Sequence, residues 1–289
     1  MSHETQTAAC FGPAGNSQRF YDEGRKHTYE AMAWLAGMGL DAYEYSAGNG
    51  IAGSRETFIK IGEEARKHHI RLSLHAPYYI SLTNNAPESL QKTLGYVQKS
   101  LEAADAMGAD IIVIHCGSVM KLDRNDALRN NFNALYTILR ETEQLAPDVA
   151  LGIETMGKRN QLGTLEEVIA LCSIAPRLRP VVDFGHLNAR EGGRFFQKDD
   201  YRRVLDAIGD KLGTERAKYL HCHFSKIEYT AAGEKCHLTL ADTQYGPSFE
   251  PLGDLLAEDG LFPRIICESS GTMADDALQM KTYYHGVLS

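Results

Sequence analysis

Residues 110–117 read DIIVIHCG, four branched apolar side chains followed by a histidine, a cysteine and a glycine. Parallel strands that are covered on both faces have such continuous apolar runs, so the stretch predicts a buried β-strand. The histidine at its end needs a partner, because an unpaired polar group is costly to bury. The stretch therefore predicts a parallel sheet with chemical groups where its strands end.

Seven other stretches resemble this one, and helix-period segments such as 56–69, 90–108 and 130–146 lie between them. The eight predicted strands are FGPAG (11–15), LDAYEYS (40–46), RLSLHAP (71–77), DIIVIHCG (110–117), ALGIETM (150–156), RPVVDFGH (179–186), YLHCHFS (219–225) and RIICESS (264–270). Eight alternations of strand and helix predict an α/β protein, a (β/α)8 TIM barrel in a single domain over 1–289. A doubly wound open sheet is the alternative, but the usual G-x-G-x-x-G turn is missing after the first strand.

The composition of the chain limits its function. The 289 residues are 43% hydrophobic and 24% charged, which suits a large globular core. No apolar run approaches the roughly 20 residues of a membrane span, and MSHETQTAAC (1–10) lacks the apolar stretch of a signal peptide, so a cytoplasmic protein without membrane contact is expected. Six cysteines without a C-x-x-C pair predict reduced thiols, and a net charge of −8 argues against a wholly basic nucleic-acid-binding surface.

Polar side chains gather at the ends of the predicted strands, where a TIM barrel carries its chemistry. Alternation along a strand puts Val113 and His115 on one side and Ile112 on the other, so the polar groups are expected to cap the barrel interior. The strand-end candidates are His75, His115, Glu154, Asp183, His186, His221, His223 and Glu268. Imidazole and carboxylate without thiolate suit catalytic Zn²⁺, Mn²⁺ or Fe²⁺, and so many donors predict two or three ions.

Seven motifs resemble, in order, those of the endonuclease IV family of apurinic/apyrimidinic endonucleases, within the xylose isomerase-like TIM barrel superfamily. The motifs are LSLHAPYYISL, VIHCGS, IETMGKRNQLGT, VDFGHLNAR, LHCHFSK, KCHLTL and ICESS, and the resemblance covers most of the chain. It implies a zinc-dependent DNA repair hydrolase of the deoxyribonuclease IV type, whose metal-bound hydroxide cuts damaged double-stranded DNA 5′ to abasic sites.

The resemblance also implies roles for single residues. It assigns His75 and His115 to the first ion, Glu154 to a bridge between the first and second ions, Asp183, His221 and Glu268 to the second ion, and His186 and His237 to the third. Glu154 and Glu268 are expected to be catalytic. Tyr78 resembles the aromatic residue that enters the DNA base stack, and His223 receives no role.

One position departs from the family. The family has an aspartate two residues before the histidine that matches His237, whereas this chain has Lys235 there. A lysine offers no acceptor and repels a cation. Glu234, one residue earlier, reaches the third ion only if the chain bends differently, so we expect either a weak third site or one that depends on Glu234.

Three functions remain open at this point. The first is the endonuclease, and net positive charge in the predicted functional-face loops, with Lys158, Arg159, Arg190 and Arg194 as candidates, agrees with phosphate contact. The second is a sugar isomerase or epimerase of the same superfamily acting on a small sugar, with one metal held by positions equivalent to Glu154, Asp183, His221 and Glu268. The third is a non-catalytic metal-binding protein.

Overall fold

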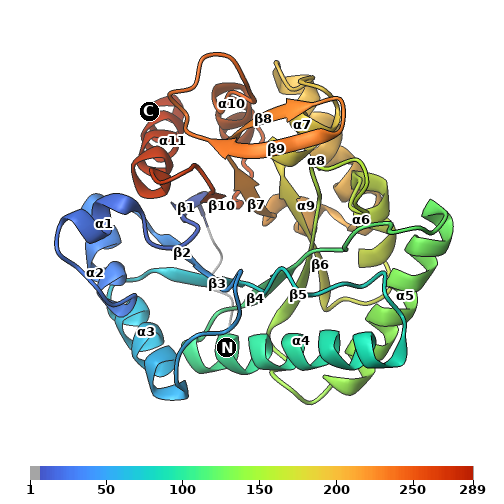
Figure 1. Ribbon diagram of the computed structural model, residues 1–289. Helices are drawn as coiled ribbons and strands as arrows, with labels where there is room; N and C mark the ends of the chain where they lie inside the picture. The colour runs from blue at the N-terminus through green and yellow to red at the C-terminus, as the bar shows by residue number, and fades with distance from the viewer. Residues whose placement is uncertain (1–6, 289) are drawn as a thin grey trace.

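The computed structural model describes residues 7–288 of the chain. Eight parallel strands surround a central axis and helices cover their outer side (Figure 1). The sheet order is β1-β10-β7-β6-β5-β4-β3-β2, and a parallel bridge between Ala14 and Glu44 joins its two edges. The strands are β1 Cys10–Pro13, β2 Ala42–Ser46, β3 Arg71–His75, β4 Ile111–Ile114, β5 Ala150–Glu154, β6 Leu178–Asp183, β7 His221–Phe224 and β10 Arg264–Cys267. The predicted TIM barrel is confirmed.

The helices form where polar caps and apolar periodicity coincide. Ser54 begins one helix by accepting a hydrogen bond from Thr57 N, and Thr164 and Glu167 form a capping box at another. The helices are α1 Gln18–Asp22, α2 Tyr29–Met38, α3 Arg55–Lys67, α4 Pro87–Met107, α5 Arg124–Glu141, α6 Leu165–Cys172, α7 Phe184–Arg190, α8 Lys198–Leu212, α9 Thr214–Lys218, α10 Glu250–Glu258 and α11 Met273–Leu288. The predicted segments 56–69, 90–108 and 130–146 correspond to α3, α4 and α5, although α5 begins earlier because Asp123 caps it.

The two faces of the strands bury different clusters, as the alternation predicts. Ile112 and Ile114 join the large core between barrel and helices, whereas Val113 packs with Ile111 and Val181 inside the barrel. Gly152 leaves room there, since a Cβ at this position would lie 2.6 Å from a methyl group of Val181. This inner apolar layer supports the polar groups above it.

Arg264 closes the opposite end of the barrel. Its side chain is buried, and its guanidinium donates to Asp110 Oδ1 at 2.8 Å and to the carbonyl of Leu72 at 3.1 Å. These contacts link β10 to the segments around β3 and β4, across the barrel. A buried guanidinium requires such partners.

Two local structures differ from the sequence prediction. The sixth strand ends at Asp183 and not at 186, because the Asp183 carboxylate accepts from His186 N at 2.7 Å and starts α7. The segment between the predicted strands 219–225 and 264–270 contains an antiparallel hairpin made of β8 Lys226–Thr230 and β9 Gly233–Leu238. Short polar strands of this kind lack the continuous apolar run that reveals the barrel strands.

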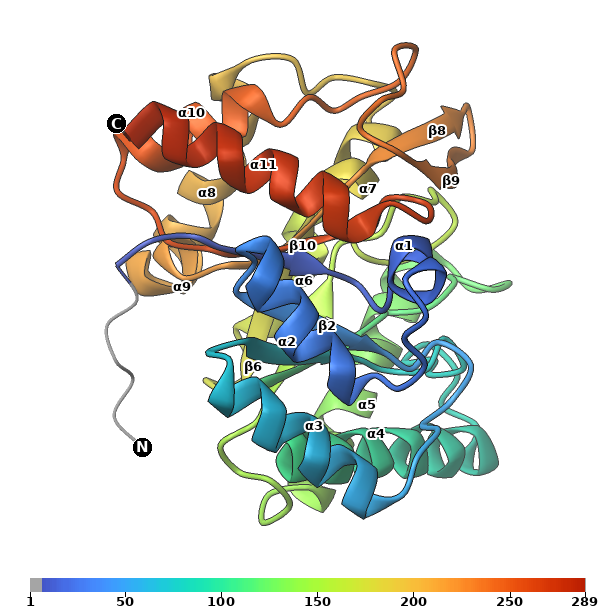
Figure 2. The same cartoon turned by 90° about the vertical axis from the view of Figure 1, so that its left-hand side faces the viewer.

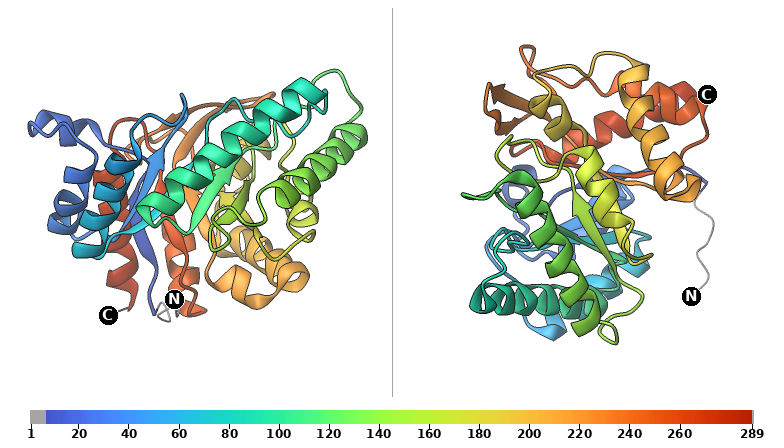
Figure 3. Two further views of the ribbon diagram at one scale, coloured as in Figure 1. Left: turned by 90° about the horizontal axis from the view of Figure 1, so that it is seen from below. Right: turned by 90° about the vertical axis from the view of Figure 1, so that its right-hand side faces the viewer.

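The hairpin lies at the end of the barrel where the strands run into their loops, on the right in Figure 2 and on the left in the right panel of Figure 3. The C-terminal end of α11 lies at the other end (Figure 2). Within residues 7–288, none of the helices has the length and apolar character to span a membrane. Residues 1–6, on which the signal-peptide expectation partly rests, lie outside the described residues.

Candidate metal centre

Glu154, at the end of β5, is the centre of the candidate site. Its side chain is fully buried, and Oε2 lies 2.9 Å from His115 Nε2 and 3.3 Å from His75 Nε2. Its other oxygen, Oε1, lies 3.0 Å from His223 Nδ1. The two oxygens of one carboxylate therefore face two different sets of imidazoles, which is the geometry a bridging ligand needs.

The first set is His75, His115 and Glu154, whose ligand atoms lie within 4.8 Å of one another. His75 comes from β3 and His115 directly follows β4, the neighbouring strand, and the centroids of the two rings lie 4.9 Å apart. The expectation that these three residues meet agrees with this geometry.

The second set is Glu154, Asp183, His223 and Glu268. Asp183 uses Oδ1 to cap α7, while Oδ2 is buried and has no hydrogen-bond partner among the described residues. A buried carboxylate oxygen without a donor is costly, and a cation supplies the missing partner. The oxygen and nitrogen donors of this set fit a divalent ion such as Zn²⁺, Mn²⁺ or Fe²⁺.

The third set is His186, Glu234 and His237. Glu234 Oε2 lies 3.4 Å from His186 Nε2, so Glu234, and not Lys235, joins the two histidines of this set. Lys235 points away and pairs with Glu228 at 2.6 Å.

A bulge in β9 explains this exchange. Cys236 faces Glu228 on β8, but the next pair is Glu234 with Tyr229, so Lys235 is an extra residue in the ladder. Residues two apart share a face in a regular strand, and one added residue shifts that alternation. Glu234 consequently shares a face with His237, three residues away.

Protein groups hold the ring nitrogens that point away from the site. His75 Nδ1 lies 3.0 Å from the carbonyl of Ala76, and His186 Nδ1 lies 2.9 Å from that of Thr155. His237 Nδ1 lies 2.8 Å from the Ser225 hydroxyl. Such contacts select the tautomer and orient the other nitrogen toward a metal ion.

The expectation for His221 is corrected. Its Nε2 lies 2.9 Å from Glu44 Oε2, inside the barrel, and His223 stands with Glu154 and Glu268 instead. Both histidines point inward, but their positions are separated by roughly 6.6 Å along the strand, which is two residues. Alternation along the strand does not distinguish the two histidines, whereas their depth in the barrel does. Glu44 was not predicted, because it lies in the middle of a strand and not at the strand end, where a TIM barrel carries its chemistry.

The carboxylates and imidazoles of the site shift each other's pKa values. Burial opposes ionisation of Glu154, but the neighbouring His223 and His115 hold its pKa well below the usual range. Burial likewise opposes the charged form of His75 and of His186, yet carboxylates outweigh it: Glu154 chiefly raises the pKa of His75 to about 9, and Asp183 and Glu234 chiefly raise that of His186 to about 9. A divalent ion that binds here must displace these protons.

Tyr78 lies over the first set. Its ring stacks on His115 at a centroid distance of 5.4 Å, yet 61% of the residue is exposed. Gly48 makes this placement feasible, because a Cβ there would lie 2.4 Å from the Tyr78 ring. The ring both covers the imidazoles and presents a face to solvent, so it combines the packing role with an accessible surface.

Arg190, one of the residues expected to contact phosphate, makes its hydrogen bonds within the protein. The Arg190 guanidinium donates to the carbonyls of Met156, Lys158 and Gln161, and therefore holds the loop after β5 in place. The same loop contacts the hairpin through a hydrogen bond from Arg159 N to Ala232 O. Arg190 thus has an internal role that the sequence did not indicate.

Comparisons with known proteins agree with this architecture. Residues 32–280 match the family model described as xylose isomerase-like TIM barrel. An uncharacterized protein of Methanocaldococcus jannaschii is 29% identical over 273 residues, which is 94% of this chain and 96% of that protein. A probable endonuclease 4 of Staphylococcus carnosus is 30% identical over 179 residues, but the match covers only 60% of this chain and 59% of that protein.

Two solved structures share the fold. Endonuclease IV from Thermus thermophilus superposes with a TM-score of 0.65 at 20% identity, covering 92% of this chain and 95% of that one. A D-tagatose 3-epimerase-like protein superposes with a TM-score of 0.63 at 19% identity, covering 86% and 90%. At these identities the likeness concerns the fold alone, and one fold hosts many chemistries.

Proposed function

Since this chain belongs to the xylose isomerase-like TIM barrel family, we propose that it is a metal-dependent phosphodiesterase that hydrolyses double-stranded DNA 5′ to abasic sites. The observation that carries the proposal is the presence of three connected donor sets at one barrel mouth. One ion takes about four to six ligands, and the three sets offer nine residues. They are His75, His115, Glu154, Asp183, His186, His223, Glu234, His237 and Glu268. We propose that they hold two or three Zn²⁺ ions, with Mn²⁺ or Fe²⁺ as alternatives.

Glu154 and Glu268 have different roles in the proposed reaction. Glu154 would hold two ions, because each of its oxygens faces a different imidazole set. When bound, the ions would stabilise charge on a phosphoryl group and activate a water molecule near neutral pH. Glu268, whose side chain is 16% exposed, lies between His223 and His237 and faces the substrate side. It is therefore placed to orient that water molecule.

The exposed ring of Tyr78 offers a stacking surface at the edge of the site. The candidate ligands Glu154, Asp183 and His223 are fully buried, so a phosphodiester within stacked DNA does not reach them. We propose that the abasic sugar turns out of the duplex and that Tyr78 stacks on a base beside the gap. The match to a probable endonuclease 4 supports this substrate class.

The alternative is a sugar isomerase or epimerase with one metal. The set Glu154, Asp183, His223 and Glu268 is by itself a four-donor site, and the fold is shared with a D-tagatose 3-epimerase-like protein. In that function the carboxylates move a proton beside a carbonyl group. The first and third donor sets have no role in it, which is why we favour the phosphodiesterase.

The test combines metal content with two activity assays. Purified protein loaded with Zn²⁺, Mn²⁺ or Fe²⁺ is incubated with a duplex carrying one abasic analogue, with the undamaged duplex, and with a panel of ketoses. We expect two or three bound ions and cleavage of the abasic duplex alone. One bound ion with ketose turnover and intact DNA would reject the phosphodiesterase in favour of the epimerase.

A further inference from the structure

We infer that Glu44 is a positioning residue for the second donor set: its carboxylate holds the His223 ring at Nε2 and so directs Nδ1 toward an ion. This inference rests on the proposed metal centre. It concerns a residue deep inside the barrel, on β2, that contributes to none of the three donor sets described above.

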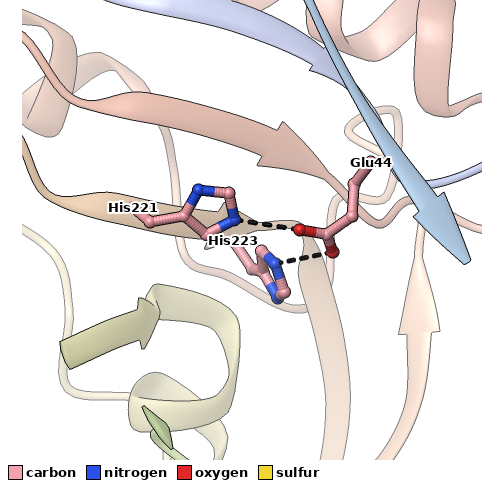
Figure 4. A group of neighbouring side chains, drawn as sticks. All are labelled: Glu44, His221 and His223. Atoms are coloured by element: carbon pink, nitrogen blue, oxygen red, sulfur yellow. Dashed lines mark hydrogen bonds and ion pairs between the residues drawn. The ribbon is translucent and has the colours of Figure 1, made fainter. Parts of the chain in front are cut away.

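Glu44 is fully buried and surrounded by donors (Figure 4). Its Oε1 lies 3.0 Å from His223 Nε2. Its Oε2 accepts hydrogen bonds from His221 Nε2 at 2.9 Å and from the Ser73 hydroxyl at 2.8 Å. A buried carboxylate is tolerated only with such partners, and their arrangement fixes where each oxygen points.

His223 joins this carboxylate to the candidate site. Its Nε2 faces Glu44, whereas its Nδ1 lies 3.0 Å from Glu154 Oε1 and 3.6 Å from Glu268 Oε1. A neutral imidazole carries one proton and one lone pair. Glu44 Oε1 and His223 Nε2 form an ion pair, and neither atom has a hydrogen-bond partner among the described residues. The inference places the proton of the metal-loaded protein on Nε2, which leaves the lone pair on Nδ1, the nitrogen that faces the second donor set.

The histidines of the donor sets differ in what contacts the ring nitrogen that points away from the proposed ion. The outward nitrogens of His75 and His186 contact backbone carbonyls, and that of His237 contacts the Ser225 hydroxyl, although His186 Nδ1 also lies 3.5 Å from Asp183 Oδ2. His223 faces a carboxylate. A full negative charge in a low-dielectric interior makes the ring a stronger ligand and adds attraction for the cation.

Glu44, His221 and His223 also bring donor atoms within 4.8 Å of one another, so a separate metal site is the competing explanation. The two hydrogen bonds to Oε2 argue against a metal ion at that oxygen, because both donors are oriented to it. Glu44 Oε1 and His223 Nε2 have no hydrogen-bond partner among the described residues, so the variants below distinguish the two roles. If Glu44 is a positioning residue, substitutions of Glu44 and of His221 lower the metal affinity to different extents. If Glu44, His221 and His223 form a metal site, the two substitutions lower it equally.

Two isosteric variants distinguish these roles. Glu44→Gln removes the charge that faces His223, while the backbone of Glu44, which accepts from Gly15 N at 2.8 Å to close the barrel, is retained. His221→Gln is the matched control, since it alters the same network but not the Glu44 contact with His223. Zinc affinity per site is measured by chelator competition, and bound zinc is counted by mass spectrometry.

We expect Glu44→Gln to lower the zinc affinity of one site about 10- to 100-fold and to leave the affinity of the site at His186, Glu234 and His237 unchanged. His221→Gln should change zinc affinity by less than about tenfold. Equal losses in both variants, or unchanged affinity in Glu44→Gln, would overturn the inference. If wild-type protein binds no zinc, the proposed metal centre itself fails, which is a different result.

Nitrogen NMR of histidine-labelled, zinc-loaded wild type gives an independent test that needs no variant. The inference predicts a proton on His223 Nε2 and a metal-shifted Nδ1 signal. The opposite tautomer would contradict it even if Glu44→Gln did not fold.

Discussion

At the scale of single residues, the candidate site depends on carboxylates that serve two neighbours each. Glu154 divides its oxygens between two imidazole sets, and Asp183 caps α7 with one oxygen while the other has no hydrogen-bond partner within residues 7–288. Glu44 faces His223 and His221 in the same way. Substituting such a residue therefore affects two contacts at once.

Glu154→Gln is expected to abolish cleavage of abasic DNA and to lower metal content by more than one ion. The amide carries no charge, so it leaves the first and second ions repelling each other. Zinc counting and the duplex assay check this. The control is Asp276→Asn, a buried carboxylate outside the site that accepts from Leu240 N at 2.8 Å; near wild-type metal content in Glu154→Gln would contradict the bridging role.

Glu234→Ala is expected to release the third ion and leave the other two bound. Its neighbour supplies a matched control: Lys235→Ala removes a side chain that is 58% exposed and pairs with Glu228, so all ions should stay. Anomalous scattering at the zinc edge measures occupancy at each position. Three occupied positions in Glu234→Ala would show that Glu234 is not a ligand.

At the scale of elements, the hairpin and the loop after β5 form the third donor set together. Glu234 N donates to the carbonyl of Gly157, and Lys158 forms an antiparallel bridge with Gly233. Gly157 lies so close to the hairpin that an added Cβ would be 2.6 Å from the Cβ of Glu234. The third set therefore depends on the position of a loop as well as on its ligands.

Gly157→Ala is accordingly expected to displace β9 and to lower the zinc affinity of the third donor set about tenfold or more, while the first two ions stay bound. Gly95→Ala, in α4, is the control, because no atom lies within 4 Å of a Cβ at that position. Site-resolved zinc competition measures both variants. The model of loop and hairpin as one unit fails if Gly157→Ala retains full third-site affinity.

Tyr78→Ala, in the loop after β3, is expected to weaken binding of abasic duplex by about 1–3 kcal/mol, because one base loses its stacking partner. Metal content should not change, since the ring contacts the imidazoles only by stacking. Tyr136→Ala is the control, as Tyr136 is 58% exposed on α5. Fluorescence anisotropy measures affinity; equal binding by Tyr78→Ala and wild type would leave Tyr78 with a packing role alone.

At the scale of the whole molecule, the two ends of the barrel have separate tasks. The loop end collects the ionisable groups of the candidate site, and the other end is closed by Arg264 with Asp110. Burial opposes ionisation of Asp110, but Arg264 outweighs it and lowers the pKa of Asp110 to about 2. In the unfolded chain the pKa of an aspartate is about 3.9.

This difference sets the direction of a pH effect on stability. The folded-state pKa is depressed, so the contribution of Asp110 is fully present above about pH 4 and is lost as the pH falls toward 2. Because the Asp110 side chain is 44% exposed and solvent screens the pair, Asp110→Asn should lower the free energy of unfolding by only about 0.5–1 kcal/mol at pH 6 and by much less near pH 2. Guanidinium denaturation of both proteins across this range checks it, and a constant difference would contradict it.

The sequence by itself determined the barrel and its functional end. Apolar runs and helix periodicity are properties of neighbouring residues, so the eight strands and the polar residues at their ends could be recognised directly. His75, His115, Glu154, Asp183, His186, Glu268 and His237 lie within the donor sets of the structure. The motifs of the resemblance supplied His237, whose hairpin has no apolar pattern of its own.

Only the tertiary structure decided which donors meet. His221 and His223 have the same parity, and their different depths follow from the pairing of β7 with its neighbours. Glu44 reaches His221 across 177 residues of sequence, and Glu234 replaces Lys235 through a bulge in the β8–β9 pairing. Register, depth and bulges depend on contacts between distant segments, and no local pattern contains that information.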